Sequence, residues 1–460
     1  MRCFMNNLFG KSLRSQMEKA GIKESELADA LSYDTTYISK WINGSKLPSV
    51  RNAERILGQM ADFFADHPGK GDTADRERRW QSSFKELKKA YDSDSSYLTF
   101  QSHSNNQMSF LDSPKMLIDL TRDAFMQALE NSDGSISVMA TFDLFRLYSG
   151  EFKRLMQELH EAGVKRVELK LALFPEDLAE DYHFYAANIL NIIGYLDYIE
   201  MSIVCQKPEQ PHILVIDKLL CVQVLWNMQG ELAAVFSMEE KIIERFSERC
   251  RQILETSEKL LDPAEPESLK RTNVQLDSYS DKRQWLFFNE PPAMLFPEDI
   301  MDQFIEEAED EAYASYLIKL KNIFMKRTCK SEIDLVLYSS MINKYLSDGN
   351  VSVGNVSHQL SEEQTRSHLA YLSEVMKTNP DFAIYLIRDT VVLSEELRNC
   401  PSIFIDSYSL YIENSQKGSN DNFHISMDPR MRSAFQQFFE RMLGQPYCTR
   451  LTAEDLLRYL

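Results

Sequence analysis

The sequence has few features that would assign this protein to a specialised class. Its seven cysteines are scattered and form no CxxC pair, so neither a disulfide framework nor a zinc site is expected, and the thiols should be reduced. Only 15 glycines and 15 prolines occur in 460 residues, which excludes a collagen-like or low-complexity chain. The longest apolar stretch, 185–196, is shorter than the roughly 18 residues of a membrane span. With no secretory signal readable either, we expect a cytoplasmic protein that does not contact membranes.

Motifs of the common catalytic and cofactor sites are also missing. No GxxxxGK[ST], GxGxxG, HExxH or GxSxG occurs, so nothing supports a phosphate cradle, a dinucleotide site, a zinc hydrolase or a serine nucleophile elbow. The acidic run 305–311 is typical of a solvated helix face rather than a metal site. His183 and His212 are interpreted as ordinary surface or hydrogen-bonded histidines. We therefore expect no enzymatic activity, no cofactor and no metal.

Positive charge is scarce, and its distribution is uneven. The net charge of −19 counts against a nucleic-acid partner, because lysine and arginine provide most of the affinity for phosphates. Residues 1–70, however, carry ten basic and eight acidic residues, a net charge of +2, which leaves 41 basic and 62 acidic residues, or −21, for the remainder. This asymmetry is typical of an N-terminal DNA reader attached to an acidic body.

The first seventy residues have the pattern of a small helical domain. Apolar spacing and capping residues predict helices near 8–20, 23–31, 35–43 and 50–64. Asp34 is a good N-cap for the third helix, whose Ile38 and Trp41 or Ile42 should point inward. Two short helices joined by a tight turn, with the small Ala28 where they approach, form a helix-turn-helix unit.

The run LADALSYDTTYISKWINGSKLPS resembles the helix-turn-helix of the phage repressor and Cro class, the Xre family. The shared features are Leu-Ala at the start of helix two, Ile-Ser inside helix three, and Asn-Gly followed by Pro-Ser after it. The resemblance covers about residues 8–64. It implies that helix three enters the major groove of double-stranded DNA. The residues it assigns to base reading are Thr35, Thr36, Tyr37 and Lys40, with Ser39 on the same free face and Asn43 and Lys46 near phosphates.

Two departures from the family pattern lower the expected non-specific affinity. Met17 stands where the family commonly has arginine, and Glu24 stands where a neutral phosphate-contacting side chain is common. An alternative interpretation is that 35–40 is only a solvated helix face in a motif that no longer binds DNA. Tyr37 could equally pack on the turn instead of reading a base.

The rest of the chain is expected to be a large α/β body of two repeated halves, which makes the protein multidomain with an all-α N-terminal domain. The predicted divisions are the DNA-binding domain 1–67, a helical linker 68–112, a first α/β half 113–260, a linker 261–294 and a second α/β half 295–460. A slide of 189 residues aligns Ser237-Met238 with Ser426-Met427 in the same order of elements, which favours a tandem duplication.

The strand ILVID, followed by a hairpin and a long helix, resembles the half-domain of the phospholipase D-like fold, which also serves as a non-catalytic effector domain in some transcription regulators. Catalysis in that family needs a histidine nucleophile, a lysine two residues on and an aspartate five further. With Asp217 as the aspartate, Gln210 and His212 occupy the other two places; with Asp406, they are Asn399 and Pro401. The resemblance therefore implies a body without this nucleophile.

These observations predict a sequence-specific DNA-binding transcription regulator whose C-terminal body dimerises, senses a small-molecule or protein effector, or both. The expected partners are double-stranded DNA and a second copy of the chain. Two rivals stay open. One is a protein-interaction scaffold or a regulator of the phage-defence or antirepressor type, and the other is an enzyme fused to a DNA reader.

Overall fold

The computed structural model describes residues 8–44, 46–49, 52–68, 75–103, 109–111, 114–148, 151–195, 199–226, 232–264, 274–289, 291–354, 356–388, 401–414 and 422–459. The chain divides into two compact units, residues 1–109 with 115–123, and residues 110–114 with 124–460. The boundaries therefore fall inside the short strand β1 (Ser109–Leu111) and inside helix α6 (Pro114–Asn131).

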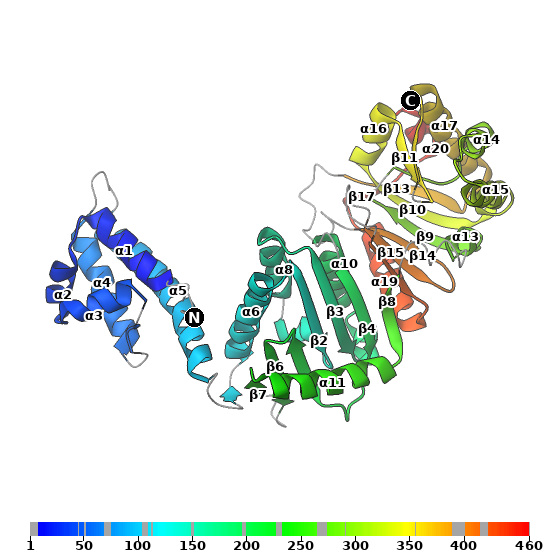
Figure 1. Ribbon diagram of the computed structural model, residues 1–460. Helices are drawn as coiled ribbons and strands as arrows, with labels where there is room; N and C mark the ends of the chain where they lie inside the picture. Colours follow the sequence, from blue (N-terminus) through cyan, green and yellow to red (C-terminus); the bar gives the residue numbers. More distant parts are fainter. Residues whose placement is uncertain are drawn as a thin grey trace. The chain divides into compact units, whose positions relative to one another are not determined.

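The first unit is entirely helical. Its helices are α1 (Leu8–Ala20), α2 (Glu24–Leu31), α3 (Thr35–Ile42), α4 (Ala53–Asp66) and α5 (Arg76–His103) (Figure 1). Each of the first four presents one apolar face to a common core, which includes Phe9, Leu27, Trp41 and Met60. The four predicted helices are thus present, and they form the all-α N-terminal part that the sequence indicated.

Helix α5 lies in the segment 68–112 that was expected to be a linker, but it belongs to this core. Leu87 is fully buried, and the buried Tyr91 packs edge-on against Phe9 with ring centroids 5.9 Å apart. The Tyr91 hydroxyl also donates a hydrogen bond to the Pro48 carbonyl at 2.9 Å. The charged composition of this helix conceals a narrow apolar stripe, which is why its packing was not predicted.

The second unit begins with a 15-stranded sheet covered by helices. Its first half contains β1 (Ser109–Leu111), β2 (Ser135–Ala140), β3 (Arg166–Leu173), β4 (Ile199–Cys205), β5 (His212–Ile216), β6 (Leu220–Trp226), β7 (Leu232–Ser237) and β8 (Lys259–Ala264). The helices of this half, besides α6, are α7 (Leu144–Tyr148), α8 (Glu151–Glu161), α9 (Pro175–Glu180), α10 (Tyr182–Tyr195) and α11 (Glu240–Thr256).

The second half contains β9 (Arg283–Phe288), β10 (Glu332–Tyr338), β13 (Phe382–Ile387), β14 (Ser402–Ile405), β15 (Leu410–Asn414), β16 (Asn422–Ser426) and β17 (Cys448–Arg450). Its helices are α13 (Val274–Tyr279), α14 (Glu298–Glu306), α15 (Glu311–Lys326), α16 (Ser339–Asp348), α17 (Glu362–Thr378), α19 (Pro429–Leu443) and α20 (Ala453–Leu457). A separate hairpin pairs β11 (Asn350–Val353) with β12 (Val356–Gln359).

The strand order shows that the two halves share one topology. The sheet runs β1-β7-β6-β5-β2-β3-β4-β8-β16-β15-β14-β9-β10-β13-β17. In the first half β2, β3 and β4 are parallel and β5 to β7 follow as antiparallel hairpins, and β9, β10, β13 and β14 to β16 repeat this arrangement. A large α/β body of two repeated halves is therefore present.

The halves meet through β8 and β16, which pair in antiparallel fashion. Every step from β4 through β8, β16, β15 and β14 to β9 is antiparallel, so β9 runs opposite to β4. The second half is consequently turned over about an axis in the sheet. Helix α19 therefore packs against α10 of the first half, whereas α11 covers the other face.

The Ser-Met pairs of the proposed repeat occupy equivalent places. Ser237 ends β7 and accepts a hydrogen bond at its hydroxyl oxygen from the Glu239 amide, at 3.2 Å. Ser426 ends β16 and accepts from the Asp428 amide at the same distance. Each serine thus shapes the turn that leads into the long helix of its half.

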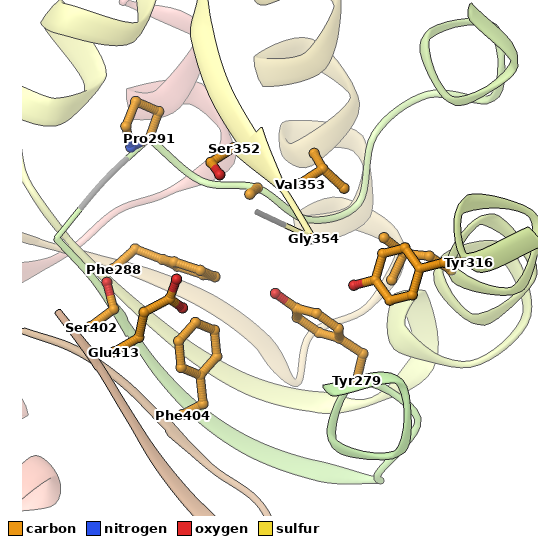
Figure 2. A pocket seen from close by; sticks show the side chains of 12 residues that line it. Tyr279, Phe288, Pro291, Tyr316, Ser352, Val353, Gly354, Ser402, Phe404 and Glu413 are labelled. Atoms are coloured by element: carbon orange, nitrogen blue, oxygen red, sulfur yellow. The ribbon is translucent and has the colours of Figure 1, made fainter. Parts of the chain in front are cut away.

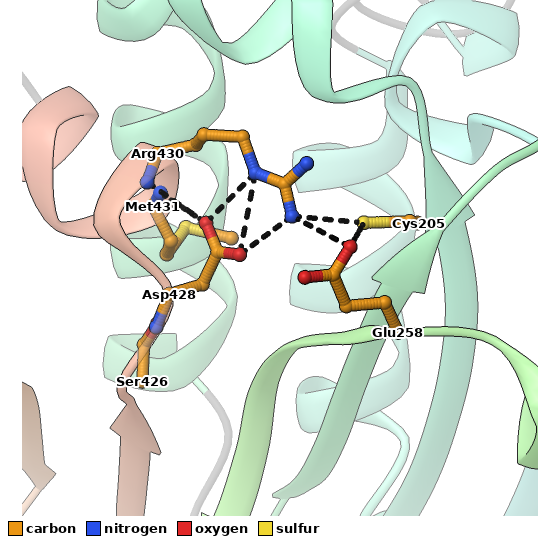
Figure 3. Close-up of polar contacts among 6 residues, drawn as sticks. All are labelled: Cys205, Glu258, Ser426, Asp428, Arg430 and Met431. Carbon is orange, nitrogen blue, oxygen red and sulfur yellow. Dashed lines mark hydrogen bonds and ion pairs between the residues drawn. The ribbon is translucent and has the colours of Figure 1, made fainter.

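Specific polar contacts also hold the halves together. Arg430, at the start of α19, donates hydrogen bonds to Asp428 at 2.6 Å and to the Cys205 sulfur at 3.3 Å, and it forms an ion pair with Glu258 at 3.0 Å (Figure 3). Burial alone raises the pKa of Asp428, but the hydrogen bonds from Arg430 outweigh it and hold that pKa below its ordinary value. His424 adds a buried contact, because its Nε2 accepts a hydrogen bond from the Met201 amide at 3.1 Å.

The boundaries within the body differ from the predicted ones. The polar stretch 261–294 was interpreted as a linker, yet it contains the end of β8, all of α13 and β9, a central strand of the second half. In β9 five of the six residues are buried. The charged and proline-containing flanks of this short strand account for the difference.

Candidate nucleic-acid interface

The turn between α2 and α3 is fixed by its backbone and its capping residues. Helix α2 buries Leu27, Ala28 and Leu31 and ends at Ser32, whose backbone is left-handed with φ 56°. The Tyr33 amide donates to the Ala28 carbonyl at 3.0 Å, which closes the end of the helix. Only Tyr33 and Asp34 separate Ser32 from the first residue of α3, so the two helices are joined by a short, defined turn.

Asp34 starts α3 as the sequence predicted. Its Oδ1 atom accepts hydrogen bonds from the Thr36 amide at 2.8 Å and from the Thr36 hydroxyl at 2.7 Å. These hydrogen bonds, with the nearby positive charge of Lys40, lower the pKa of Asp34. Because the Thr36 hydroxyl proton is directed to Asp34, its oxygen lone pairs are the part left to face a base, where they would accept from an amino group.

Helix α3 separates an inner face from an outer one. Ile38, Trp41 and Ile42 are buried, with exposed fractions of 0%, 2% and 5%. The residues predicted to contact DNA all lie on the exposed surface: Thr35, Thr36, Tyr37, Ser39, Lys40, Asn43 and Lys46. The structure thus brings them together on one helix and the loop that follows it. The Lys46 amide donates to the Lys40 carbonyl at 3.2 Å, which folds this loop back onto the end of the helix.

Tyr37 lies at the edge of this surface and contacts the turn. Its ring meets Tyr33 edge-on with centroids 5.9 Å apart, and Tyr33 in turn packs on Trp41 at 5.2 Å. The Lys40 ammonium lies 5.8 Å from the Tyr37 ring centroid. Tyr37 is nevertheless 43% exposed, so much of the side chain faces solvent. Tyr37 therefore packs on the turn and also leaves part of its side chain exposed on the outer face of α3, where a base could be contacted.

Tyr33 is a contributor that the sequence analysis missed. It directly precedes the N-cap Asp34, the position where an apolar residue commonly packs back on the first turns of a helix. Recognising that arrangement would have identified it. By holding Tyr37 and Trp41, Tyr33 fixes the orientation of the outer face.

Helices α1, α4 and α5 support the two-helix motif from behind. Gln16 of α1 donates to Glu86 of α5 at 2.5 Å and accepts from Ser83 at 3.2 Å. Lys88 forms an ion pair with Glu54 of α4 at 3.1 Å. These contacts join α1, α4 and α5, and α1 also packs against α3, whose eight residues would not form a stable helix alone.

In the first half, the positions that the phospholipase D-like resemblance assigns to the nucleophile and the lysine lie at or just before the start of β5. His212 begins β5, with its Nε2 atom 2.9 Å from Gln206 Nε2, and burial lowers its pKa. Gln210 lies in the loop before it, where its amide donates to the Ser257 hydroxyl at 3.4 Å. Pro401 directly precedes β14, whereas Asn399 lies outside the described residues. In the described part of the chain no cluster of three or more His, Cys, Asp or Glu side chains could hold a metal, and no helix there is long and apolar enough to cross a membrane.

Comparison with known proteins identifies the N-terminal segment. Residues 13–59 match the family model described as helix-turn-helix. No curated protein matches the chain. Two solved structures have low similarity. TrmBL2, an archaeal chromatin protein, is 10% identical over 52% of this chain and 100% of its own, with a TM-score of 0.25. NucT from Helicobacter pylori is 11% identical over 33% of this chain and 98% of its own, with a TM-score of 0.22.

Those TM-scores are too low to carry an argument about the body. The match over 13–59 spans α2, α3 and the turn between them, together with most of α1 and half of α4. The N-terminal unit therefore carries a DNA-binding helix-turn-helix of the Xre/Cro type.

Proposed function

We propose that the protein is a sequence-specific transcription regulator that reads double-stranded DNA with α3 and whose body dimerises, responds to an effector, or both. The observation that carries the proposal is the outer face of α3. It gathers hydroxyl, phenol and ammonium groups on a helix whose inner face is fully packed, within a segment that matches a helix-turn-helix model. Such a face fits the major groove, where hydroxyls and lysine can contact base edges.

The distribution of charge supports a model in which the N-terminal unit contacts DNA and the body does not. Residues 1–70 carry a net charge of +2 and the remainder −21, so the body is repelled by the phosphate backbone. A single helix-turn-helix offers few phosphate contacts, and Asp34, the N-cap of α3, adds a negative charge beside its outer face. Two readers held by a dimeric body would bind half-sites about one helical turn apart. Cytoplasmic location remains a prediction that accords with this role.

The DNA-binding part is tested by selecting binding sites from a random duplex library with the full chain. Lys40→Ala and Thr36→Ala should each weaken binding to the selected site by about 1–3 kcal/mol. Lys85→Ala is the matched control, because Lys85 is an exposed lysine on α5. Full affinity in a folded Thr35/Thr36/Lys40 triple alanine variant would refute the assignment of α3.

The oligomeric part is tested by light scattering and footprinting of the full chain and of residues 1–103. This fragment retains α5 and therefore the buried Leu87 and Tyr91. We expect a full-length dimer that protects a pseudo-palindrome and a monomeric fragment that binds the same DNA weakly. A monomeric full chain, or a fragment that binds as tightly, would show that the body does not pair the readers.

We also propose that the body is not an enzyme. Gln210 and His212 stand where a phospholipase D-like nucleophile and lysine would be needed, so covalent phosphoryl chemistry has no nucleophile there. Incubation of the purified chain with a generic phosphodiester tests this. Turnover that is lost on mutating a body residue would overturn it.

A further inference from the structure

The first turn of α3 presents oxygen atoms whose hydrogen-bonding direction is fixed. Asp34 Oδ1 accepts from the Thr36 amide at 2.8 Å and from the Thr36 hydroxyl at 2.7 Å. A threonine hydroxyl has one proton, so a proton given to Asp34 cannot be given to a base as well. Both side chains are exposed on the outer face of the helix. A base that meets Thr36 therefore meets an acceptor.

Asp34 does not reverse this direction, because it stays ionised at neutral pH. The hydrogen bonds from the Thr36 side chain and backbone lower the pKa of Asp34, and the positive charge of Lys40 adds to the effect. A carboxylate has no proton to donate. If the Thr36 hydroxyl turned away, it would lose a hydrogen bond to a charged acceptor, which is stronger than one between neutral groups. We therefore expect the bond to persist on DNA.

The four bases differ in what they offer to such an acceptor. In the major groove cytosine and adenine each present an exocyclic amino group, N4 or N6. Guanine presents the acceptors O6 and N7, and thymine presents the acceptor O4, so either would face the Thr36 oxygen with a second acceptor and leave both unpaired. Adenine carries the acceptor N7 beside its amino group, whereas cytosine does not. Cytosine is therefore the better match beside the Asp34 carboxylate.

The position of Thr36 in the helix suits base reading. It is the second residue of α3, and the N-terminal residues of a recognition helix are those that contact base edges. Lys40 follows four residues later on the same stripe, about 6 Å further along the axis. Its ammonium is only a donor, so the stripe presents an acceptor and then a donor. A C·G pair, which has an amino group on one strand and two acceptors on the other, offers both partners.

We propose that Thr36, oriented by Asp34, selects the exocyclic amino group of a cytosine or an adenine, with cytosine preferred, at one position of the site that α3 reads. Thr36 contacts the base, and Asp34 is a positioning residue that fixes the direction of the hydroxyl. The proposal deepens the function proposed above and rests on it, since it requires α3 to read the major groove. The competing interpretation is that Thr36 reads thymine through its methyl group.

Site selection from a random duplex library separates the two interpretations. Thr36→Ser keeps the hydroxyl and removes the methyl group, whereas Thr36→Val keeps a methyl group and removes the hydroxyl. We expect the full chain and Thr36→Ser to select cytosine or adenine at one position, and Thr36→Val to lose that preference. Thr35→Val is the matched control, because it makes the same exchange at the neighbouring exposed residue and should leave that position unchanged. Far-UV circular dichroism checks the folding of every variant.

A base analogue tests the amino group itself. The selected duplex is made with that base replaced by its analogue without the amino group, 2-pyrimidinone for cytosine or purine for adenine. The full chain should lose affinity by about fivefold or more, the size of one hydrogen bond. Thr36→Val should lose less than about twofold on the same replacement, because it has no hydroxyl oxygen to accept from the amino group. The same replacement outside the protected site controls for the weaker base pair.

Asp34→Gly tests the positioning role. Glycine is tolerated at an N-cap, but it has no side-chain oxygen to hold the Thr36 hydroxyl, which can then donate as well as accept. Selection with this variant should admit guanine or thymine at the same position, a change that the loss of a purely structural cap would not cause. An unchanged preference in folded Asp34→Gly would overturn the role of Asp34.

Guanine or thymine at the position that Thr36→Val relaxes would overturn the base assignment, as would an unchanged preference in folded Thr36→Val. An equal loss of affinity in the full chain and Thr36→Val when the amino group is removed would also overturn it. A thymine preference that Thr36→Val keeps and Thr36→Ser loses would refute it in favour of methyl reading. These outcomes leave the proposed function intact, whereas a chain that selects no duplex refutes that function and the base assignment together.

Discussion

Ser32, at the end of α2, adopts a backbone conformation that glycine adopts at far lower cost. Its φ is 56°, in the left-handed region, where a side chain with Cβ costs roughly 1–2 kcal/mol. Replacing it with glycine removes this cost but adds about 0.5–1 kcal/mol of chain entropy lost on folding. Ser32→Gly should therefore stabilise the N-terminal unit by about 0.5–1 kcal/mol, or raise its Tm by about 2–8 °C.

Replacing Gly21, in the same unit, tests the opposite change, from glycine to a residue with a Cβ atom. It is also left-handed, with φ 68°, and a Cβ atom added there would meet no other atom within 4 Å. Gly21→Ala therefore tests the backbone preference without a clash, and should destabilise by roughly 1 kcal/mol. Thermal unfolding of residues 1–103, followed by far-UV circular dichroism, measures both.

A third variant separates strain from loss of the serine hydroxyl. Ser32→Ala retains the Cβ atom, so its Tm should stay within about 2 °C of the parent. Because Ser32→Gly leaves the outer face of α3 unchanged, DNA affinity should be preserved. A fall in Tm for Ser32→Gly together with no fall for Gly21→Ala would refute the assignment of backbone strain to this turn.

Three further outcomes follow from buried groups. Trp41→Ala should destabilise the N-terminal unit by about 3–5 kcal/mol, because the indole is only 2% exposed. The loss is measured as a lower Tm of residues 1–103, and a loss below about 1 kcal/mol would contradict the place of Trp41 in the core. Burial lowers the pKa of His424 to about 3, so between about pH 6.5 and 3 the unfolded chain binds a proton at this residue that the folded chain does not. The free energy of unfolding, measured in urea, should therefore fall as the pH drops through that window, by up to about 1.4 kcal/mol per pH unit from this group. His424→Gln should remove the contribution of this one proton from the pH dependence. Arg430→Met should cost about 1–3 kcal/mol of body stability in urea, because the buried Asp428 loses its cationic partner and keeps only hydrogen bonds from the backbone amides of Arg430 and Met431. Arg251→Met at an exposed pair should cost less than about 0.5 kcal/mol, and equal effects would argue against a role for Arg430 in joining the halves.

Local sequence signals made the N-terminal helix-turn-helix predictable. The spacing of Ile38 and Trp41, the N-cap Asp34 and the glycine after Asn43 all act within a few residues, and each is found where the sequence indicated. Helix α5 was not predicted to pack, because its stripe of Leu87 and Tyr91 is diluted by charges. Its docking depends on Phe9, some eighty residues away in the chain.

The body was predictable in outline and less so in its connections. Repeated order of strands and helices revealed the two halves, since periodic elements are local. The pairing of β8 with β16 joins residues about 160 positions apart, and no local pattern encodes such a register. Tyr279, Tyr316 and Glu413, which line one pocket of the second half (Figure 2), come from α13, α15 and β15, so no local pattern places them together.

The pairing of β8 with β16 adds the second half to an edge of the first, and the same kind of edge addition, repeated between molecules, would build a polymer. The contact is head-to-tail, joining the last strand of one half to the hairpin edge of the next, and contacts of that kind can repeat without limit. The equivalent hairpin edge of the first half, β7, is already occupied by β1. At the other end β17 has only three residues, too short to template a long addition. The sheet is therefore terminated at both ends, which keeps a fold built by edge addition from growing into a fibre.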